Sequence, residues 1–511
     1  MKDFLAIAYI SYEAAKQMKS LSRFGVTATF LVSLHSVYAS NAAPGLSSDQ
    51  KVVHVLDRLG YGPSPEDSRN VSTLGIQQYI SQQLHPESIK DPDWLSERLS
   101  RIDAINQNQT TIYKKYSSQA FKEIESDTAA RKTFILDRTN FVNQAREARI
   151  LRALYSPAQL QEVMVDFWYN HFNIWESKTP TNGAILGAYE NNAIRPYALG
   201  KFKDLLLANA KEMAMLYYLD NWRNRYTSTG TKNINENYAR EVMELHTLGV
   251  GGYSQSDINA LARLLSGWTY VSDPNASNAG NFLFDAKSHD PNEKTFLGVS
   301  FPAGGGYSEG EQALLNLANS PKTAQHIAHD LVELFVNDTP PQLLVHKVAQ
   351  RYMESDGDIK ELLITIFQSD EFWSQKNHKT KFKTPLYYMI SSLRAAGLPP
   401  IQDSRLLQTW VKQSGNGLFA WPAPDGYKNT EGAWLSPDVL INRANFSYKL
   451  AAGWMSLWGS DQEGGNPHPN DQDMLSTIGS GLSPSTISVI KRAPESVHSA
   501  LILSSPDFMY R

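Results

Sequence analysis

The chain has 511 residues, 41% of them hydrophobic, and a net charge of −4, so it can bury a large core and does not resemble a disordered protein. The near balance of acidic and basic residues gives no electrostatic footprint for nucleic acid, and we predict no nucleic-acid partner. Cysteine is absent, which excludes disulfides, thiolate metal sites and thiol nucleophiles.

The N-terminus carries a short apolar run preceded by basic residues. Lys19 and Arg23 come before the apolar stretch 24–34, and a Val-Tyr-Ala triplet follows as a small-residue cleavage site. We predict a signal peptide in residues 1–39, with the true start at Met18, and therefore a periplasmic or secreted protein. The alternative is an ordinary N-terminal helix. The apolar run is too short to span a bilayer, and we predict no membrane span elsewhere.

Helical periodicity dominates the rest of the chain, with apolar residues recurring every three to four positions. We predict a mainly α fold: one large multi-helix domain over residues 47–511, with irregular loop-rich insertions. The first insertion, at about 273–308, has room for a few short strands. The second is an irregular segment at about 415–436, rich in glycine and proline.

Capping residues predict where several of these helices begin. Ser156, followed by proline, is a candidate N-cap for the helix that contains "DFWYNHF". Asn233 with Glu236, and Ser254 with Asp257, have the three-residue spacing of a capping box. We therefore expect two further helices to start at these pairs.

The stretch "DFWYNHFNIWESKTPTNG", starting at Asp166, gathers rings, a histidine and asparagines. On a helix, Trp168 and His171 share one face, while Asp166 and Asn170 line another. One interpretation is a glycan site, in which flat rings contact sugars and polar groups bind hydroxyls. The alternative is an aromatic core stripe with a hydrogen-bonded histidine.

The stretch "NENYAREVMELHTLG" places two carboxylates one helical turn apart. Glu241 and Glu244 could raise each other's pKa, as acid–base chemistry requires, or bind a hard cation through oxygen. Arg240 can pair with Glu244 across one turn, so the alternative is a solvated face with an ion pair. His246 falls on the opposite, apolar stripe, which favours a core histidine.

Two loops add further candidates. "FDAKSHDPNEKTFLG" contains His289 and Asp290, a pair that can orient an imidazole, although an Asx turn is the alternative. "LFAWPAPDGYKN" contains Trp421 and Asp425 in a turn stiffened by prolines. A phosphate-binding loop, a dinucleotide fingerprint, an HExxH helix and a GxSxG elbow are all missing, so hydride transfer and nucleotide-driven chemistry have no support.

These stretches, with "KTPLYYMISSLRAAG" and the closing "LILSSPDFMYR", occur in an order that resembles the bacterial family catalogued as domain of unknown function 1800. The resemblance runs from about Val52 to Arg511 and implies an exported, mainly helical protein of the cell envelope. It implies no activity. The motif positions that it highlights are Asn170, His171, Arg240, Glu241, Glu244, Trp268, His289, Asp290, Trp421 and Asp425. Tyr169 stands where the family often has histidine, which argues against a two-histidine metal site on this helix.

Our first hypothesis is an exported enzyme that cleaves an envelope or extracellular polysaccharide, by hydrolysis or by lyase chemistry, without a cofactor. The catalytic candidates are His171, Glu241, Glu244 and Asp290. The substrate-binding candidates are Trp168, Asn170, Arg240, Trp268, His289, Trp421 and Asp425. A second hypothesis is a non-catalytic envelope protein that binds a glycan or a partner. A third is a metal-dependent hydrolase with Glu241, Glu244, His171 and His289 as ligands.

Overall fold

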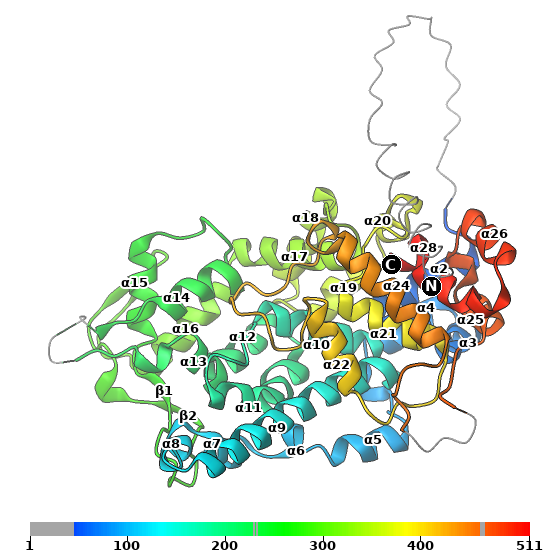
Figure 1. The fold of residues 1–511 in the computed structure, drawn as a ribbon. Helices are drawn as coiled ribbons and strands as arrows, with labels where there is room; N and C mark the ends of the chain where they lie inside the picture. The colour runs from blue at the N-terminus through cyan, green and yellow to red at the C-terminus, as the bar shows by residue number, and fades with distance from the viewer. Residues whose placement is uncertain (1–44, 228–229, 231–232, 460–464) are drawn as a thin grey trace, which may run out of the picture. The chain divides into compact units, whose positions relative to one another are not determined.

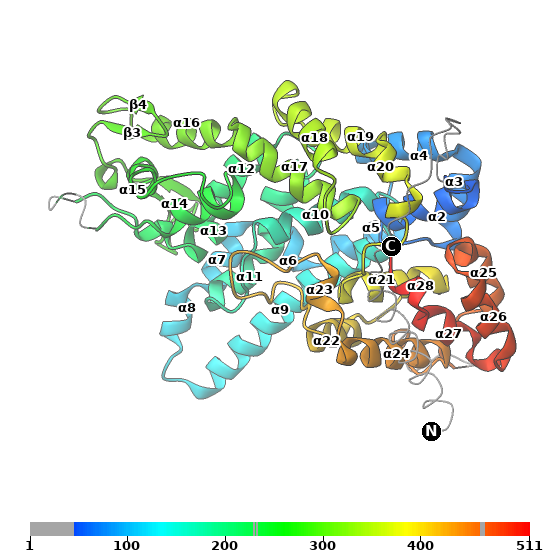
Figure 2. The ribbon, with the colours of Figure 1, turned by 90° about the horizontal axis from the view of Figure 1, so that it is seen from above.

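The computed structural model describes residues 45–227, 230, 233–459 and 465–511. The predicted signal peptide and start at Met18 lie outside these ranges. Within them the chain is mainly helical, as predicted, and the strands are confined to two antiparallel pairs (Figures 1 and 2). No helix in this part of the chain is both long enough and apolar enough to cross a membrane.

The helices group into two compact units, each built from separate stretches of the chain. Of the described residues, unit 1 comprises 45–76, 370–403, 430–459 and 465–511. Unit 2 comprises residues 77–369 and 404–429 and contains every predicted site residue.

Unit 2 begins with a series of helices that lead into the "DFWYNHF" stretch and beyond it. They are α4 (Ile76–Gln83), η1 (Pro86–Ser88), α5 (Asp93–Ser100), α6 (Asp103–Asn106), α7 (Gln109–Tyr116), α8 (Ser118–Glu123), α9 (Thr128–Tyr155), α10 (Gln159–His171), α11 (Pro180–Tyr189), η2 (Glu190–Ile194), η3 (Arg195–Tyr197), α12 (Phe202–Lys211), α13 (Met213–Tyr218) and η4 (Asn221–Arg223).

The second half of unit 2 holds the strands. Its elements are α14 (Asn237–Glu241), η6 (Val242–His246), α15 (Gln255–Leu264), β1 (Trp268–Tyr270), β2 (Phe282–Phe284), η7 (Ala286–Ser288), β3 (Lys294–Phe296), β4 (Val299–Phe301), α16 (Tyr307–Ala318), α17 (Pro321–Phe335), α18 (Gln342–Glu354), α19 (Ile359–Phe367) and, after the return of the chain, α22 (Arg405–Gln413). The elements η2 and η6 are π-helical turns.

The centre of unit 2 is α11, which is buried from Thr181 to its end and packs against α6, α7, α9 and α13. Gly187 explains how closely it can pack. A Cβ at this position would lie 2.3 Å from the carbonyl oxygen of Ala104, so only glycine permits this approach. The small and apolar sequence of α11 therefore creates a central helix against which the much longer α9 can pack closely.

The strands lie where the loop-rich insertion was predicted, and they are short. β1 pairs with β2, with Trp268 opposite Phe284, and β3 pairs with β4, with Lys294 opposite Phe301. The first pair begins just before residue 273, because Trp268 belongs to β1. The segment 415–436 is irregular apart from α23 (Glu431–Trp434).

One of the three predicted helix starts is confirmed. Ser254 and Asp257 form a complete capping box at the start of α15. The prediction for Asn233 and Glu236 is wrong, because α14 begins at Asn237 and Glu236 is an N-cap without a side-chain cap bond. The carboxylate of Glu236 instead accepts hydrogen bonds from other side chains, including the 2.8 Å bond from Gln255.

The third predicted start is displaced by two residues. Ala158, not Ser156, is the N-cap of α10. The hydroxyl of Ser156 donates to Asp91 at 2.6 Å, so it serves a tertiary contact rather than a full cap. The hydrogen bond to the Asp91 carboxylate therefore replaces the helix-capping role that serine usually has at such a position.

Unit 1 combines the first described helices with the last ones. Its elements are α2 (Ser48–Leu59), α3 (Pro65–Leu74), α20 (Asp370–Trp373), η8 (Gln375–Asn377), α21 (Pro385–Ala396), α23, α24 (Pro437–Ala451), α25 (Asp471–Ile478), η9 (Gly479–Gly481), α26 (Pro484–Arg492), η10 (Glu495–Val497), α27 (His498–Ser504) and α28 (Pro506–Met509). Every residue of α21 is buried, and α21 packs against α24 and α25.

Candidate functional site

The end of α10 carries the aromatic cluster, and its largest ring belongs to the core. Trp168 is fully buried, and its indole Nε1 donates to the carbonyl of Ala198 at 2.9 Å. The ring also packs edge-on against His171. A buried and hydrogen-bonded indole has no face for a sugar ring, so we remove Trp168 from the substrate-binding set.

The two asparagines of this stretch hold a distant loop in place. Asn170 donates to the carbonyl of Tyr427 at 2.8 Å and accepts from the backbone N–H of the same residue at 2.7 Å. Asn173 donates to the carbonyls of Trp421 at 3.0 Å and Ala423 at 2.7 Å. Four hydrogen bonds from two side chains thus bind residues 421–427, which we call the WPAPDGY loop.

Glycine is required where this loop crosses α10. Gly426 has φ = +65°, a conformation that few other residues adopt. A Cβ there would lie 2.3 Å from the carbonyl oxygen of Asn170. The Asp-Gly-Tyr sequence therefore serves the close approach of loop and helix, and Asn170 is a positioning residue rather than a ligand of substrate.

The WPAPDGY loop presents Trp421 and Asp425 at a partly open surface. The Trp421 indole donates to Asp425 Oδ1 at 2.8 Å, and its ring centroid lies 4.9 Å from that of Tyr427. The other carboxylate oxygen of Asp425 lies 3.6 Å from the ammonium group of Lys428. The Asp425 side chain is 35% exposed, so it can reach a ligand.

Glu241 and Glu244 come from α14 and the π-helical turn that follows it, and both are half-buried. Burial raises the pKa of Glu241, the Glu244 and Asp425 carboxylates raise it further, and Arg240 opposes them. Glu244 accepts a 2.6 Å hydrogen bond from the Tyr253 hydroxyl. We call Glu241, Glu244 and Asp425 the acidic face.

Tyr218 connects the two parts of the acidic face. Its hydroxyl donates to the carbonyl of Pro422 in the WPAPDGY loop at 2.8 Å. Burial raises the pKa of this hydroxyl, and the charges of Glu241 and Asp425 raise it further. The tyrosine therefore lies within electrostatic range of both carboxylates and fixes the loop beside them.

Arg240 is held by other partners. Its guanidinium lies 3.5 Å from Glu236 and donates to Gln255 at 3.3 Å, while its side chain is 42% exposed. The predicted pairing with Glu244 is therefore replaced by these contacts. The acidic face keeps an excess of negative charge.

His171 belongs to a separate, buried group of histidines. Its side chain is 6% exposed, and Nε2 donates to the carbonyl of His246 at 3.1 Å. Its Nδ1 lies 3.9 Å from Asp330, and His326 contacts the same carboxylate oxygen at 3.4 Å. Burial lowers the pKa of His171 to about 4, although the negative charge of Asp330 acts to raise it. We therefore leave His171 out of the proposed catalytic set.

The loop with His289 and Asp290 forms another buried group. Asp290 is fully buried and receives a 2.5 Å hydrogen bond from Arg263. His289 Nδ1 donates to the carbonyl of Ser266 at 2.9 Å, and its Nε2 faces Glu309 at 3.3 Å. These contacts support the short strands, so we assign both residues a structural role.

Trp268 lies in the same region and is fully buried, stacked on Tyr307 with ring centroids 5.4 Å apart. Gly310 lies directly over the indole, where a Cβ would come within 2.7 Å. Trp268 therefore fills the core between β1 and α16 and offers no surface to a sugar.

The predicted metal ligands are divided among these groups. His171 faces Asp330, His289 faces Glu309, and the two glutamates lie on the acidic face. In the ranges that the structure describes, no set of three or more histidine, aspartate or glutamate side chains is placed to hold a metal ion.

Several residues of these groups were missed by the sequence analysis. His326 and Asp330 stand four residues apart on α17, a spacing that places them on one helix face and was available in the sequence. Tyr218 and Tyr253 had no distinguishing pattern around them. Their roles depend on which segments meet in the folded unit.

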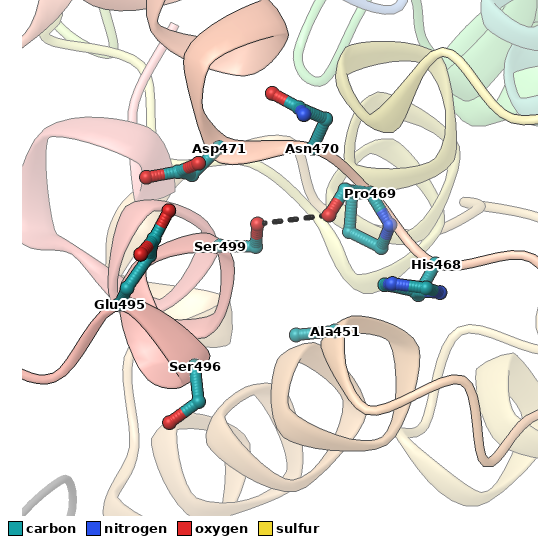
Figure 3. Close-up of a pocket in the computed structure, with 8 residues that line it drawn as sticks. All are labelled: Ala451, His468, Pro469, Asn470, Asp471, Glu495, Ser496 and Ser499. Carbon is teal, nitrogen blue, oxygen red and sulfur yellow. Dashed lines mark hydrogen bonds between the residues drawn. The ribbon is translucent and has the colours of Figure 1, made fainter.

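Unit 1 contains a separate polar pocket of about 550 Å³ between α24, α25 and η10 (Figure 3). Asp471 and Glu495 lie next to each other at its edge, and Ser499 donates to the carbonyl of Pro469. Asp471 also accepts a 2.7 Å hydrogen bond from His498. None of the predicted site residues lines this pocket.

Comparison with known proteins identifies the family of this chain but does not identify an activity. The family model described as "Protein of unknown function (DUF1800)" matches residues 54–510, which covers both units and all segments of the acidic face. No curated protein and no solved structure matches the chain.

Proposed function

Because the chain belongs to the family of proteins of unknown function DUF1800, its activity has to be inferred from its own side chains, and we propose that it hydrolyses glycosidic bonds at the acidic face. The observation that carries the proposal is the raised pKa of Glu241 beside a carboxylate from a separate segment, Asp425. Glycoside hydrolysis uses two carboxyl groups, one holding a proton and one ionised.

In this proposal Glu241 is the general acid. Its proton passes to the glycosidic oxygen as the bond between C1 and that oxygen breaks. Water adds to C1 and returns a proton to the carboxylates. The negative charge of the Asp425 side chain stabilises the positive charge that develops on the sugar ring. Trp421, held by its bond to Asp425, supplies an aromatic face next to the reacting groups.

The charge of the acidic face favours hydrolysis over lyase chemistry. Lyase cleavage of a uronate needs a cation to neutralise the substrate carboxylate. Arg240 contacts Glu236 and Gln255, and Lys428 lies 3.6 Å from Asp425, so these two cations already face negative or polar partners. The three carboxylates of the acidic face would repel an acidic sugar. We therefore propose a neutral polysaccharide of the envelope or the surroundings as the substrate, and export by the predicted signal peptide as the route to it.

The test compares the full chain with its Glu241→Gln and Asp425→Asn variants on a panel of neutral and acidic polysaccharides, with reducing ends as the readout. Glu123→Gln, an exposed carboxylate of α8, is the matched control. We expect each site variant to lose about 100-fold or more in kcat and to keep its circular dichroism and melting temperature. The control should be unchanged.

The opposite result would favour a different function. If no polysaccharide is cleaved by the wild-type chain but one binds it, the protein is a glycan-binding protein of the second hypothesis. If the two variants cleave as fast as wild type, the acidic face is not the catalytic site.

A further inference from the structure

A second polar pocket lies in unit 2 and shares no residue with the acidic face. Its volume is about 580 Å³, within the range of small-molecule sites. It is formed by residues 105–109 from the α6–α7 connection, Asn192 of η2, the end of α12 and the start of β2. None of these residues was selected by the sequence analysis.

Glu212 places a buried carboxyl group at this pocket. In the part of the chain that the structure describes, its Oε2 is shielded from solvent and has no hydrogen-bond partner. The buried side-chain oxygen of Gln107, also in the lining, is in the same situation. A buried polar atom without a partner is energetically costly, so both side chains can gain from turning toward a polar group bound in the pocket that they line.

The carboxyl of Glu212 holds its proton at neutral pH. Burial raises its pKa to about 8. In this state the group is uncharged, and it can both donate and accept a hydrogen bond, as a side-chain amide can.

The other polar groups of the lining are also uncharged or neutralised. Gln109 donates its side-chain N–H to the carbonyl of Gly280 at 2.6 Å. This bond leaves the side-chain oxygen of Gln109 available to accept from another group. The ammonium group of Lys211 is paired with Glu311 at 2.7 Å. The half-buried ring of Phe282 adds one apolar surface.

We propose that this pocket binds a neutral, hydroxyl-rich ligand, namely a sugar unit, with Glu212 and Gln107 as its central hydrogen-bonding groups. The neutral amides and the protonated carboxyl match hydroxyl groups, which also donate and accept. The ring of Phe282 matches the apolar face of a pyranose. An organic cation would instead require an ionised Glu212, so the two ligand classes differ in their pH dependence.

The experiment measures binding to the full chain by saturation-transfer NMR and by titration calorimetry between pH 6 and pH 9.5. The probes are glucose, N-acetylglucosamine and maltotriose as neutral sugars, and butylamine as the cation. We expect at least one of the sugars to bind, with an affinity that is constant below pH 8 and falls about tenfold per pH unit above it, as Glu212 ionises.

Three variants locate the site. Glu212→Gln keeps a neutral hydrogen-bonding group, so it should retain sugar binding and lose the pH dependence. Asn192→Trp places a bulky ring at an exposed position of the lining and should weaken sugar binding at least tenfold. Glu123→Gln, the exposed control on α8, should leave sugar binding unchanged.

The proposal is overturned if none of the three sugars binds, or if sugar binding survives Asn192→Trp unchanged. It is also overturned if butylamine binds more tightly than the sugars and Glu212→Gln abolishes that binding. Each of these results can occur whether or not the acidic face cleaves a polysaccharide.

Discussion

Individual carboxyl groups of unit 2 differ in pKa because their surroundings differ. Asp290 faces Arg263 and Asn292, and although burial opposes them, these contacts lower its pKa. Burial raises the pKa of Glu241, and two other carboxylates raise it further. The sequence marked both as candidate catalytic carboxyl groups, so only their neighbours explain why one is structural and the other is a candidate acid.

The first prediction concerns the pH dependence of the acidic face. A general acid must be protonated, so activity should fall as pH rises through the pKa of Glu241. Replacing Glu244 by glutamine removes a negative charge that raises this pKa, so the alkaline limb of the kcat/KM profile should move to lower pH. A profile in Glu244→Gln that moves to higher pH, or stays in place, would contradict the assignment of Glu241.

The second prediction concerns His171 and stability. Its pKa is about 4 in the folded chain and near 6.5 when unfolded, so between these values only the unfolded state binds the proton. The contribution to stability is complete above pH 6.5 and is lost as pH falls toward 4. A shift of this size corresponds to roughly 3 kcal/mol.

Urea unfolding of wild type and His171→Phe at pH 7.5 and pH 4.5 measures this effect. The variant keeps a ring against Trp168 but has no titrating group. We expect its unfolding free energy to fall less between the two pH values than that of wild type. Equal losses in both proteins would show that the proton is not excluded from His171.

At the scale of elements, the WPAPDGY loop depends on α10 for its position. Its backbone is bound by Asn170, Asn173 and Tyr218, and these bonds replace the regular pairing that an irregular segment lacks. The asparagines of the "DFWYNHFN" stretch thus act on the acidic face indirectly. They hold the element that carries Asp425.

The third prediction is that Gly426→Ala releases this loop. The added Cβ meets the backbone of α10 and the φ of +65° disfavours alanine, so the loop has to move. We expect faster hydrogen exchange in residues 417–429 and loss of most activity at the acidic face. Gly432→Ala is the matched control, because nothing lies within 4 Å of its added Cβ. Unchanged exchange in Gly426→Ala would contradict this role.

At the scale of the whole molecule, the chain passes between its two compact units four times. Unit 1 takes residues from the first and the last described segments and from 370–403, and unit 2 takes 77–369 and 404–429. Neither unit is therefore one continuous stretch of sequence. Inside unit 1, the final residues pair with the middle segment, where Arg511 and Lys381 exchange two backbone hydrogen bonds of 2.8 and 3.2 Å.

The fourth prediction is that deleting Tyr510 and Arg511 destabilises unit 1. The deletion removes this backbone pairing and the buried guanidinium that lies 4.3 Å from the ring centroid of Tyr387. At about 1 kcal/mol for each hydrogen bond, the loss is at least about 2 kcal/mol. Hydrogen exchange should accelerate in 370–403 and stay unchanged in 77–369. Tyr510→Phe, which keeps the backbone, is the control. Protection of 370–403 equal to wild type would refute this account.

Four features could be predicted without a structure: the helical class, the places of the irregular segments, the capping box at Ser254 and the family. These features depend on local periodicity and on short-range capping, which neighbouring residues encode. The helix start near Ser156 could not be predicted in this way, because the hydroxyl of that residue was taken by Asp91, 65 positions away.

Which of the selected residues meet could be learned only from the folded chain. Trp168, Trp268, His171 and Asp290 shared the spacing of site residues but lie buried, while Glu241, Glu244 and Asp425 form one acidic face. No sequence pattern marked Glu212 as a binding residue, because a single glutamate before an apolar helix is common. Burial and charge proximity arise from contacts between distant segments, and these contacts exist only after folding.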